Sequence, residues 1–158
     1  EVIVRRARAV GVGVATEQEI DRLNILEATR LAMRRALASL TPPADCLLID
    51  AVTLSHLAIP SRAIIKGDTL SISIAAASIV AKVTRDRMMV LYHRTYPDYN
   101  FLSHKGYGTE EHLQRLAQHG PCAIHRRTFA PVAQLLSGSS GRAPFSRAGL
   151  GESPRMNQ

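Results

Sequence analysis

The chain has 158 residues, a formal net charge of +7 at pH 7 and a sequence pI of about 10.1. Its 46% hydrophobic and 21% charged residues are typical of globular proteins and exclude a wholly disordered chain. No stretch approaches the ~20 apolar residues that cross a bilayer and no signal-peptide core is visible, so we predict a cytoplasmic protein of one domain that contacts no membrane.

The first third of the chain predicts a strand and a long helix. Residues 2–9 are typical of the end of a helix, and Val10–Val14 alternates valine with glycine, which favours a short buried strand. Thr16–Glu19 reads Thr-Glu-Gln-Glu, a capping box that begins a helix. Apolar residues recur at helical spacing as far as Leu40, and Pro42 ends the helix.

The middle of the chain predicts two strands, each followed by an aspartate. Cys46–Ile49 is apolar without alternation, which is typical of a strand covered on both faces of an α/β sheet, and it ends at Asp50. A second apolar run, residues 63–65, ends at residues 66–68, which read Lys-Gly-Asp. A helix rich in small residues is predicted from Ser71 to about Arg94.

The last third predicts loops around one further helix. Tyr96–Asn100 is a turn, Ser103–Thr109 is a glycine-containing loop, and Thr109 caps a helix that ends at His119. We predict no regular element after Pro131. The polar, glycine-rich residues from about Ser137 predict a disordered tail.

The charge is unevenly distributed along the chain. Residues 41–81 carry a net −1, whereas residues 82–130 carry a net +4 and five of the six histidines, whose protonation would raise that charge further. Basic surfaces bind nucleic acids, but they also simply keep proteins soluble. Charge alone leaves these two interpretations about equal.

The two aspartates at the strand ends are the candidate metal ligands. If the strands are neighbours, Asp50 and Asp68 reach the same edge of the sheet and repel each other unless a cation lies between them. Oxygen ligands without nearby Cys or paired His favour Mg²⁺ or Mn²⁺. Either aspartate alone would more often cap a turn. Asp86 is a reserve ligand, although flanking arginines favour a salt-bridged helix surface there.

A second set of candidates is suited to a nucleic acid. Tyr107 lies between two glycines, where it could contact a sugar or base, or could fill a gap in the core. Lys105 could contact phosphate. Arg126 and Arg127, in the triplet His-Arg-Arg, could do the same or could be ordinary surface residues.

Over about residues 10–132 the chain resembles the ribonuclease HII family. Seven stretches carry the resemblance in family order: 11–15 (Gly-Val-Gly-Val-Ala), 20–29, 48–50 (Leu-Ile-Asp), 65–68 (Ile-Lys-Gly-Asp), 73–87, 103–109 (Ser-His-Lys-Gly-Tyr-Gly-Thr) and 125–131 (His-Arg-Arg-Thr-Phe-Ala-Pro).

The resemblance implies an α/β, ribonuclease H-like fold with a mixed sheet, flanking helices and a helical C-terminal part. It also implies an endonuclease that uses Mg²⁺ or Mn²⁺ to cut the RNA strand of RNA–DNA hybrids and ribonucleotides embedded in duplex DNA, with no obligate protein partner. By motif, Asp50 and Asp68 would be the third and fourth of four active-site carboxylates. Tyr107 would sense the ribose 2′-OH, and Lys105, Arg126 and Arg127 would contact the nucleic-acid backbone.

One motif of the family is missing from the 158 residues. The Asp-Glu-x-Gly-Arg-Gly motif, which supplies the first two carboxylates, does not occur. We therefore expect residues 1–132 to form a catalytic domain incomplete at its N-terminus, followed by a tail over 133–158, and we expect this chain alone to be inactive. The alternatives are a non-catalytic basic nucleic-acid-binding module of the same descent, and a truncated product that does not fold independently.

Overall fold

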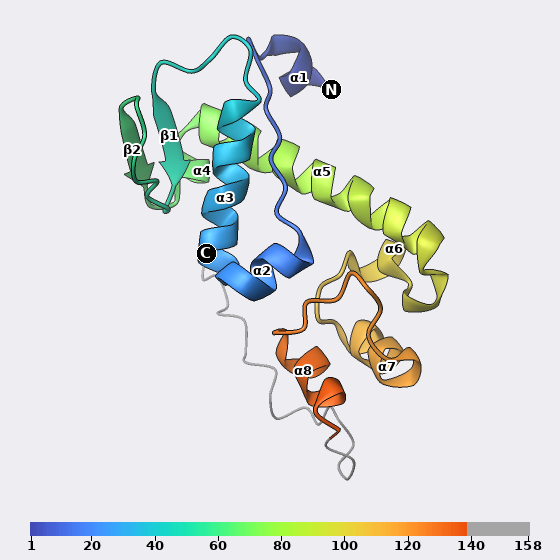
Figure 1. Ribbon diagram of the computed structural model, residues 1–158. Coiled ribbons are helices and arrows are strands. Elements are labelled where there is room, and N and C mark those ends of the chain that lie inside the picture. Colours follow the sequence, from blue (N-terminus) through green and yellow to red (C-terminus); the bar gives the residue numbers. More distant parts are fainter. Residues whose placement is uncertain (139–158) are drawn as a thin grey trace. The chain divides into compact units, whose positions relative to one another are not determined.

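The computed structural model describes residues 1–138 (Figure 1). The described chain divides into two compact units, one of residues 1–91 and one that begins at residue 92, and the division falls within a long helix. The helices are α1 (Val2–Arg6), α2 (Glu17–Leu23), α3 (Ile25–Ala38), α4 (Gly67–Leu70), α5 (Ile72–Thr95), the short 3₁₀ helix η1 (Pro97–Tyr99), α6 (Phe101–His104), α7 (Glu110–His119) and α8 (Ala130–Leu136), and the strands are β1 (Leu47–Asp50) and β2 (Ser61–Ile64).

The helix predicted from Thr16 to Leu40 is two helices. The capping box is confirmed: the Glu19 backbone N–H donates to Thr16 Oγ1, and the Thr16 N–H donates to the Glu19 carboxylate. Asn24 then interrupts the helix at a φ of 72°, a conformation that asparagine tolerates better than most residues. Its side-chain oxygen accepts from the backbone N–H groups of Leu26 and Glu27 and so caps α3.

The prediction of a buried strand at Val10–Val14 is wrong. The segment has no strand partner within residues 1–138, and its three valines are 38–45% exposed. The reason is the close approach of the glycines to α3: a Cβ on Gly11 would lie 2.2 Å from the Ala36 carbonyl oxygen, and one on Gly13 would lie 1.9 Å from that of Ala32. The glycine face therefore packs against a helix backbone.

An arginine fastens the same segment to α3. The Arg35 guanidinium donates to the Val14 carbonyl oxygen at 2.7 Å and to both carboxylate oxygens of Glu19, at 2.7 and 2.6 Å. The hydrogen bonds from Arg35, followed by those from Thr16, lower the pKa of Glu19 to about 2. This carboxylate thus stays ionised into strong acid, and the link between segment 10–15, α2 and α3 persists with it.

The two aspartate-terminated runs form a parallel pair of strands. β1 and β2 pair in register, with Asp50 opposite Ile64 (Figure 1). Ile49 is buried, but Leu48 and most of β2 are exposed, so the expectation of strands covered on both faces is wrong for the residues described. The reason is that within residues 1–138 the sheet has only these two strands.

Helix α5 confirms the helix predicted from Ser71 to about Arg94. It is the longest helix described, with 24 residues, and it buries Ile74 and Met89. Among residues 1–138 no helix is both long and apolar enough to cross a membrane.

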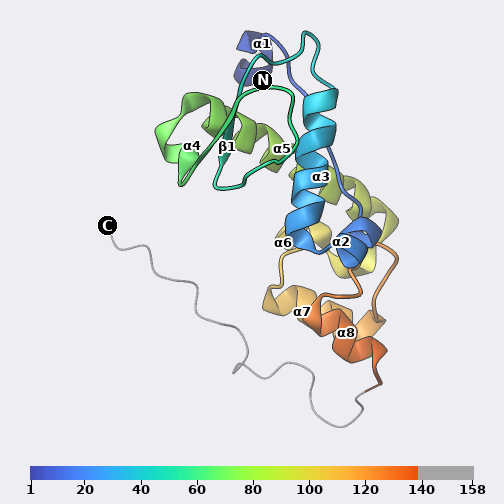
Figure 2. The same cartoon turned by 60° about the vertical axis from the view of Figure 1, so that its left-hand side comes forward.

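The second unit is built around α7. This helix contacts η1, α6 and α8, and Figures 1 and 2 both show α7 and α8 side by side. The fully buried side chains are Phe101, Leu116 and Val132. The prediction of no regular element after Pro131 is wrong, because α8 continues to Leu136. Most of the predicted tail, residues 139–158, lies outside the described residues.

The substitution Gly13→Ala tests the contact between segment 10–15 and α3. A methyl group there meets a helix carbonyl and must separate the two backbones, so we expect the free energy of unfolding to fall by about 1–3 kcal/mol. Val12→Ala on the exposed side of the same segment should change it by less than about 0.5 kcal/mol. Urea unfolding followed by circular dichroism measures both, and equal losses would contradict the assigned packing.

Candidate active site

Asp50 and the Lys66-Gly67-Asp68 motif meet through a hydrogen bond. The Gly67 backbone N–H donates to Asp50 Oδ1 at 2.9 Å. Gly67 is buried, and a Cβ there would lie 2.6 Å from Ile74 Cδ1 and 3.5 Å from Asp50 Oδ1. A glycine at this position therefore lets the motif approach the end of β1 closely.

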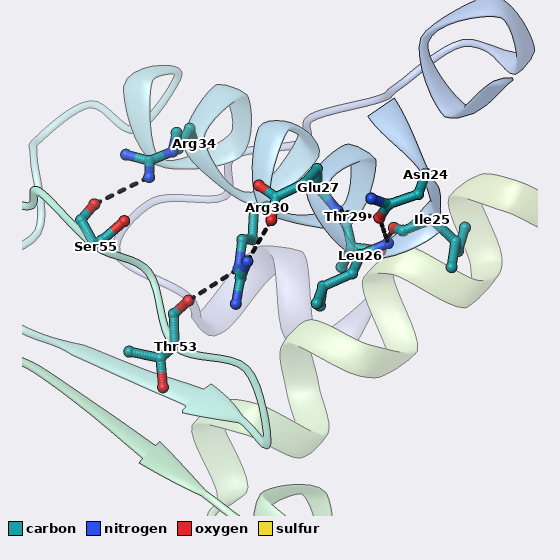
Figure 3. Close-up of polar contacts among 9 residues, drawn as sticks. All are labelled: Asn24, Ile25, Leu26, Glu27, Thr29, Arg30, Arg34, Thr53 and Ser55. Carbon is teal, nitrogen blue, oxygen red and sulfur yellow. Dashed lines mark hydrogen bonds and ion pairs between the residues drawn. The ribbon is translucent and has the colours of Figure 1, made fainter. Parts of the chain in front are cut away.

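The chain after Asp50 is held by two arginines of α3 (Figure 3). Arg30 Nε donates to the Thr53 carbonyl oxygen at 3.2 Å, and Arg34 Nη2 donates to that of Ser55 at 2.9 Å. Glu27 forms an ion pair with Arg30 and restrains its guanidinium. The end of β1 is thereby fixed from both sides, by α3 and by the Lys-Gly-Asp motif.

The two other candidate ligands lie on helices. Asp68 is exposed in the first turn of α4, directly after the glycine that binds Asp50. Asp86 forms an ion pair with Lys82 at 3.6 Å on α5, and its Oδ1 is buried without a hydrogen-bond partner. Within residues 1–138 no three His, Cys, Asp or Glu side chains gather where they could hold a metal ion.

Tyr107 lies on the loop between α6 and α7, in the second unit. Its side chain is 56% exposed, which argues against a role as a filler of the core. Its backbone is firmly held: the N–H donates to the His104 carbonyl oxygen at 2.9 Å, and the carbonyl oxygen accepts from Thr109 N–H and from His112 Nδ1, both at 2.8 Å. An exposed ring on an ordered backbone is suited to contact with a ligand.

The structure brings Arg126 close to the loop of Tyr107. The Arg126 guanidinium lies 5.5 Å from the centre of the Phe129 ring, and the edge of that ring is 3.4 Å from the position of a Cβ on Gly108. Arg127 is exposed next to it. Lys105 has a local role that the sequence did not predict: its Nζ donates to the Leu102 carbonyl oxygen at 2.7 Å, at the end of α6.

Sequence reasoning missed a cluster of three histidines behind this loop. His104 and His112 are buried and their rings stack, with centroids 4.2 Å apart, and His125 approaches His112 with its Nε2 at 3.1 Å. Burial, and secondarily the neighbouring histidines, lower the pKa of His125 to about 4, and burial lowers that of His112. Mild acid therefore does not charge His125, contrary to expectation. The sequence signal that could have indicated this cluster is the presence of His104 and His112 on either side of the glycine-flanked Tyr107.

Comparisons with known proteins identify the family of the chain. The profile of the ribonuclease HII family matches residues 1–132. The ribonuclease HII of Bacillus velezensis is 56% identical over 130 residues, which cover 82% of this chain and 51% of that protein. The ribonuclease HII of Parvibaculum lavamentivorans is 57% identical over 129 residues, covering 81% and 48%.

A solved structure shows the same fold. The crystal structure of the ribonuclease H2 from Pyrococcus horikoshii OT3 is similar with a TM-score of 0.61 and 26% sequence identity, covering 77% of this chain and 65% of that one. The fold is thus that of a ribonuclease H2-like α/β protein, as predicted. The chain belongs to the ribonuclease HII family, whose members are ribonuclease H-type endonucleases. It spans about half to two thirds of the length of the curated relatives it matches.

The hydrogen bond between Asp50 and Gly67 predicts a difference between two substitutions. Asp50→Ala leaves the Gly67 N–H without its acceptor, and we expect the free energy of unfolding to fall by about 1–3 kcal/mol. Asp50→Asn keeps an oxygen at the same place and should cost less than about 1 kcal/mol. Urea unfolding compares the two variants, and an equal loss in both would show that this bond does not hold the motif.

Proposed function

We propose that this chain is the portion of a ribonuclease HII that supplies two of the catalytic carboxylates and the surface that recognises a ribonucleotide. The whole enzyme would hydrolyse the RNA strand of RNA–DNA hybrids and cut at ribonucleotides embedded in duplex DNA. The hydrogen bond from Gly67 to Asp50 is the observation that carries the proposal, because it joins a strand-end carboxylate to the Lys-Gly-Asp motif that contains Asp68.

Asp50 and Asp68 fit Mg²⁺ or Mn²⁺ as ligands. Both offer carboxylate oxygens, which hard divalent cations prefer, and neither has a cysteine or histidine partner that would favour zinc. The Gly67 N–H engages Asp50 Oδ1 and so sets the orientation of the whole carboxylate. When bound, two such ions activate water and stabilise the leaving oxygen of a phosphodiester. We propose that the first two family carboxylates complete the site and that Asp86 is not a ligand, since Lys82 pairs with it.

The second unit supports a role in recognising the substrate. The exposed Tyr107 side chain can pack against a sugar and place its hydroxyl beside a ribose 2′-OH, the group that distinguishes RNA from DNA. Arg126 and Arg127 add positive charge near that loop for contact with phosphates, and we propose that Lys105 contributes a similar charge. This function requires a duplex that carries at least one ribonucleotide.

A non-catalytic nucleic-acid-binding module remains the second candidate. It is favoured by one observation: among the described residues no three His, Cys, Asp or Glu side chains are placed to hold a metal ion together, whereas the basic residues and Tyr107 are present. Such a module would bind duplexes in a salt-sensitive way that neither Mg²⁺ nor Asp50→Asn changes.

Cleavage of a duplex with one embedded ribonucleotide distinguishes the two candidates. We expect no cleavage by this chain alone, and Mg²⁺-dependent cleavage when a polypeptide that carries the Asp-Glu-x-Gly-Arg-Gly motif of a relative is added in trans. Asp50→Asn and Asp68→Asn should each reduce the restored rate by at least about 100-fold, because each removes a metal ligand. Asp98→Asn, on η1, is the matched control and should leave the rate unchanged.

Cleavage by the chain alone would show that it needs no further carboxylates. Restored cleavage that survives both Asp50→Asn and Asp68→Asn would contradict their assignment as ligands.

The role of Tyr107 is tested by binding rather than cleavage. We expect the chain to bind a duplex with one ribonucleotide more tightly than the all-DNA duplex of the same sequence. Tyr107→Phe should reduce that preference by about three- to tenfold, since it removes one hydrogen bond to the 2′-OH. Arg126→Gln should weaken both duplexes to a similar extent because phosphate contacts carry no such preference. Fluorescence anisotropy at fixed salt measures the dissociation constant of each of the three proteins for each duplex, and an unchanged preference in Tyr107→Phe would exclude this role.

A further inference from the structure

The histidine cluster behind the Tyr107 loop has only one consistent arrangement of protons. A backbone carbonyl oxygen can only accept, so His104 Nε2 must donate to the Tyr99 carbonyl at 2.7 Å and His112 Nδ1 must donate to the Tyr107 carbonyl at 2.8 Å. His104 Nδ1 accepts from the Gly106 N–H at 3.1 Å. His104 is therefore neutral, with its proton on Nε2.

The same reasoning extends to the other two rings. His125 Nδ1 accepts from the Cys122 backbone N–H at 3.0 Å, so in the neutral ring the proton lies on Nε2. That nitrogen is 3.1 Å from His112 Nε2, which can accept because His112 already carries its proton on Nδ1. The bonds form one directed chain, from Cys122 N–H through His125 and His112 to the carbonyl of Tyr107.

We infer that this chain of neutral imidazoles positions the Tyr107 loop, and that His112 is a positioning residue for recognition of the ribonucleotide. The inference rests on the proposed role of Tyr107 in reading the 2′-OH. His104 and His112 bind the backbone on both sides of the ring-bearing residue, at Gly106 N–H and at the Tyr107 carbonyl. The loop is thus held by side chains and not only by its own turns, and the tyrosine ring remains exposed.

The packing around the cluster keeps its rings in place. Phe101, 2% exposed, contacts the edges or faces of all three imidazoles, with ring centroids 5.6–5.8 Å apart. The Tyr99 ring stacks on Phe101, and its centroid lies 5.0 Å from the centroid of the His125 ring. Phe101 and Tyr99 give the imidazoles apolar surroundings, in which the charged form of an imidazole has a higher free energy than in water.

Protonation of His112 or of His125 breaks the directed series of hydrogen bonds. A proton on His112 Nε2 or on His125 Nδ1 sets two donors against each other, at His125 Nε2–H or at Cys122 N–H. The other titratable groups that face the cluster are the Cys122 thiol, the Tyr99 phenol, His119 against Tyr99, and Glu111, whose carboxylate interacts with His104. The pKa of His125 is lowered from 6.5 to about 4, so the neutral chain is intact above pH 6.5 and is lost as the pH falls toward 4.

Two substitutions at one position separate the hydrogen bond from the packing. The asparagine amide places an N–H near the position of Nδ1, so His112→Asn can still donate to the Tyr107 carbonyl, whereas His112→Gln places its amide near Nε2 and cannot. In the full chain we expect His112→Gln to reduce the preference for a ribonucleotide-containing duplex by about three- to tenfold and to speed exchange of the Tyr107 amide hydrogen. His112→Asn should restore most of both. Gln118→Ala, on the exposed face of the same helix, is the control and should change neither.

The proton arrangement is measured directly. Long-range ¹H–¹⁵N correlation spectra at pH 7 should show His112 protonated on Nδ1, and His104 and His125 on Nε2. The protection factor of the Tyr107 amide, which is the ratio of its intrinsic to its observed exchange rate at the same pH, should fall as the pH is lowered from 6.5 toward 4. A His112 proton on Nε2, or amide exchange that is the same in wild type and His112→Gln, would overturn the inference. If the wild-type chain binds both duplexes equally, the proposed function fails, and the tautomers and the amide exchange still decide whether the network holds the loop.

Discussion

The hydrogen bond between the Gly67 N–H and the Asp50 carboxylate is the constraint on which the arrangement around the end of β1 depends. Parallel strands bring their carboxyl ends to one edge of a sheet, and Asp50 lies at the end of β1. A charge-assisted hydrogen bond from Gly67 joins this carboxylate to the motif that carries Asp68. Arg30 and Arg34 hold the loop that follows Asp50, so the end of β1 is restrained on both sides of this carboxylate.

Local chemistry was predictable from the sequence where a few neighbouring residues decide the structure. The capping box at Thr16 and the cap at Thr109 both form, because each needs only a hydroxyl and the first amides of its own helix. The strand-end positions of Asp50 and the Lys-Gly-Asp motif were also visible, since a short apolar run followed by a polar residue marks both. Their connection through Gly67 was not, because a hydrogen bond across 17 residues leaves no periodic pattern.

The wrong predictions have a common cause in tertiary contacts. Val10–Val14 has the composition of a buried strand, yet its glycines pack against the backbone of α3 and its valines face outward. Asn24 lies within a stretch of helical apolar spacing, but its side chain accepts hydrogen bonds from the first amides of α3, so α2 ends there and α3 begins. Helix α8 begins at Ala130 and has Pro131 in its first turn, where proline is favourable. We interpreted this proline as the end of regular structure, although apolar residues follow it.

The histidine network suits the proposed role of the Tyr107 loop in nucleic-acid recognition, because it holds the loop with uncharged rings. A polyanionic duplex raises the local proton concentration and raises the pKa of nearby bases, so a histidine of ordinary pKa behind the Tyr107 loop would become charged on binding. Burial against Phe101 and the neighbouring imidazoles lowers the pKa of His125 to about 4, which leaves a wide margin before that happens. The positive charge near the loop is carried instead by arginines such as Arg126 and Arg127, which stay charged at physiological pH, and the proposed role needs no charge on His125.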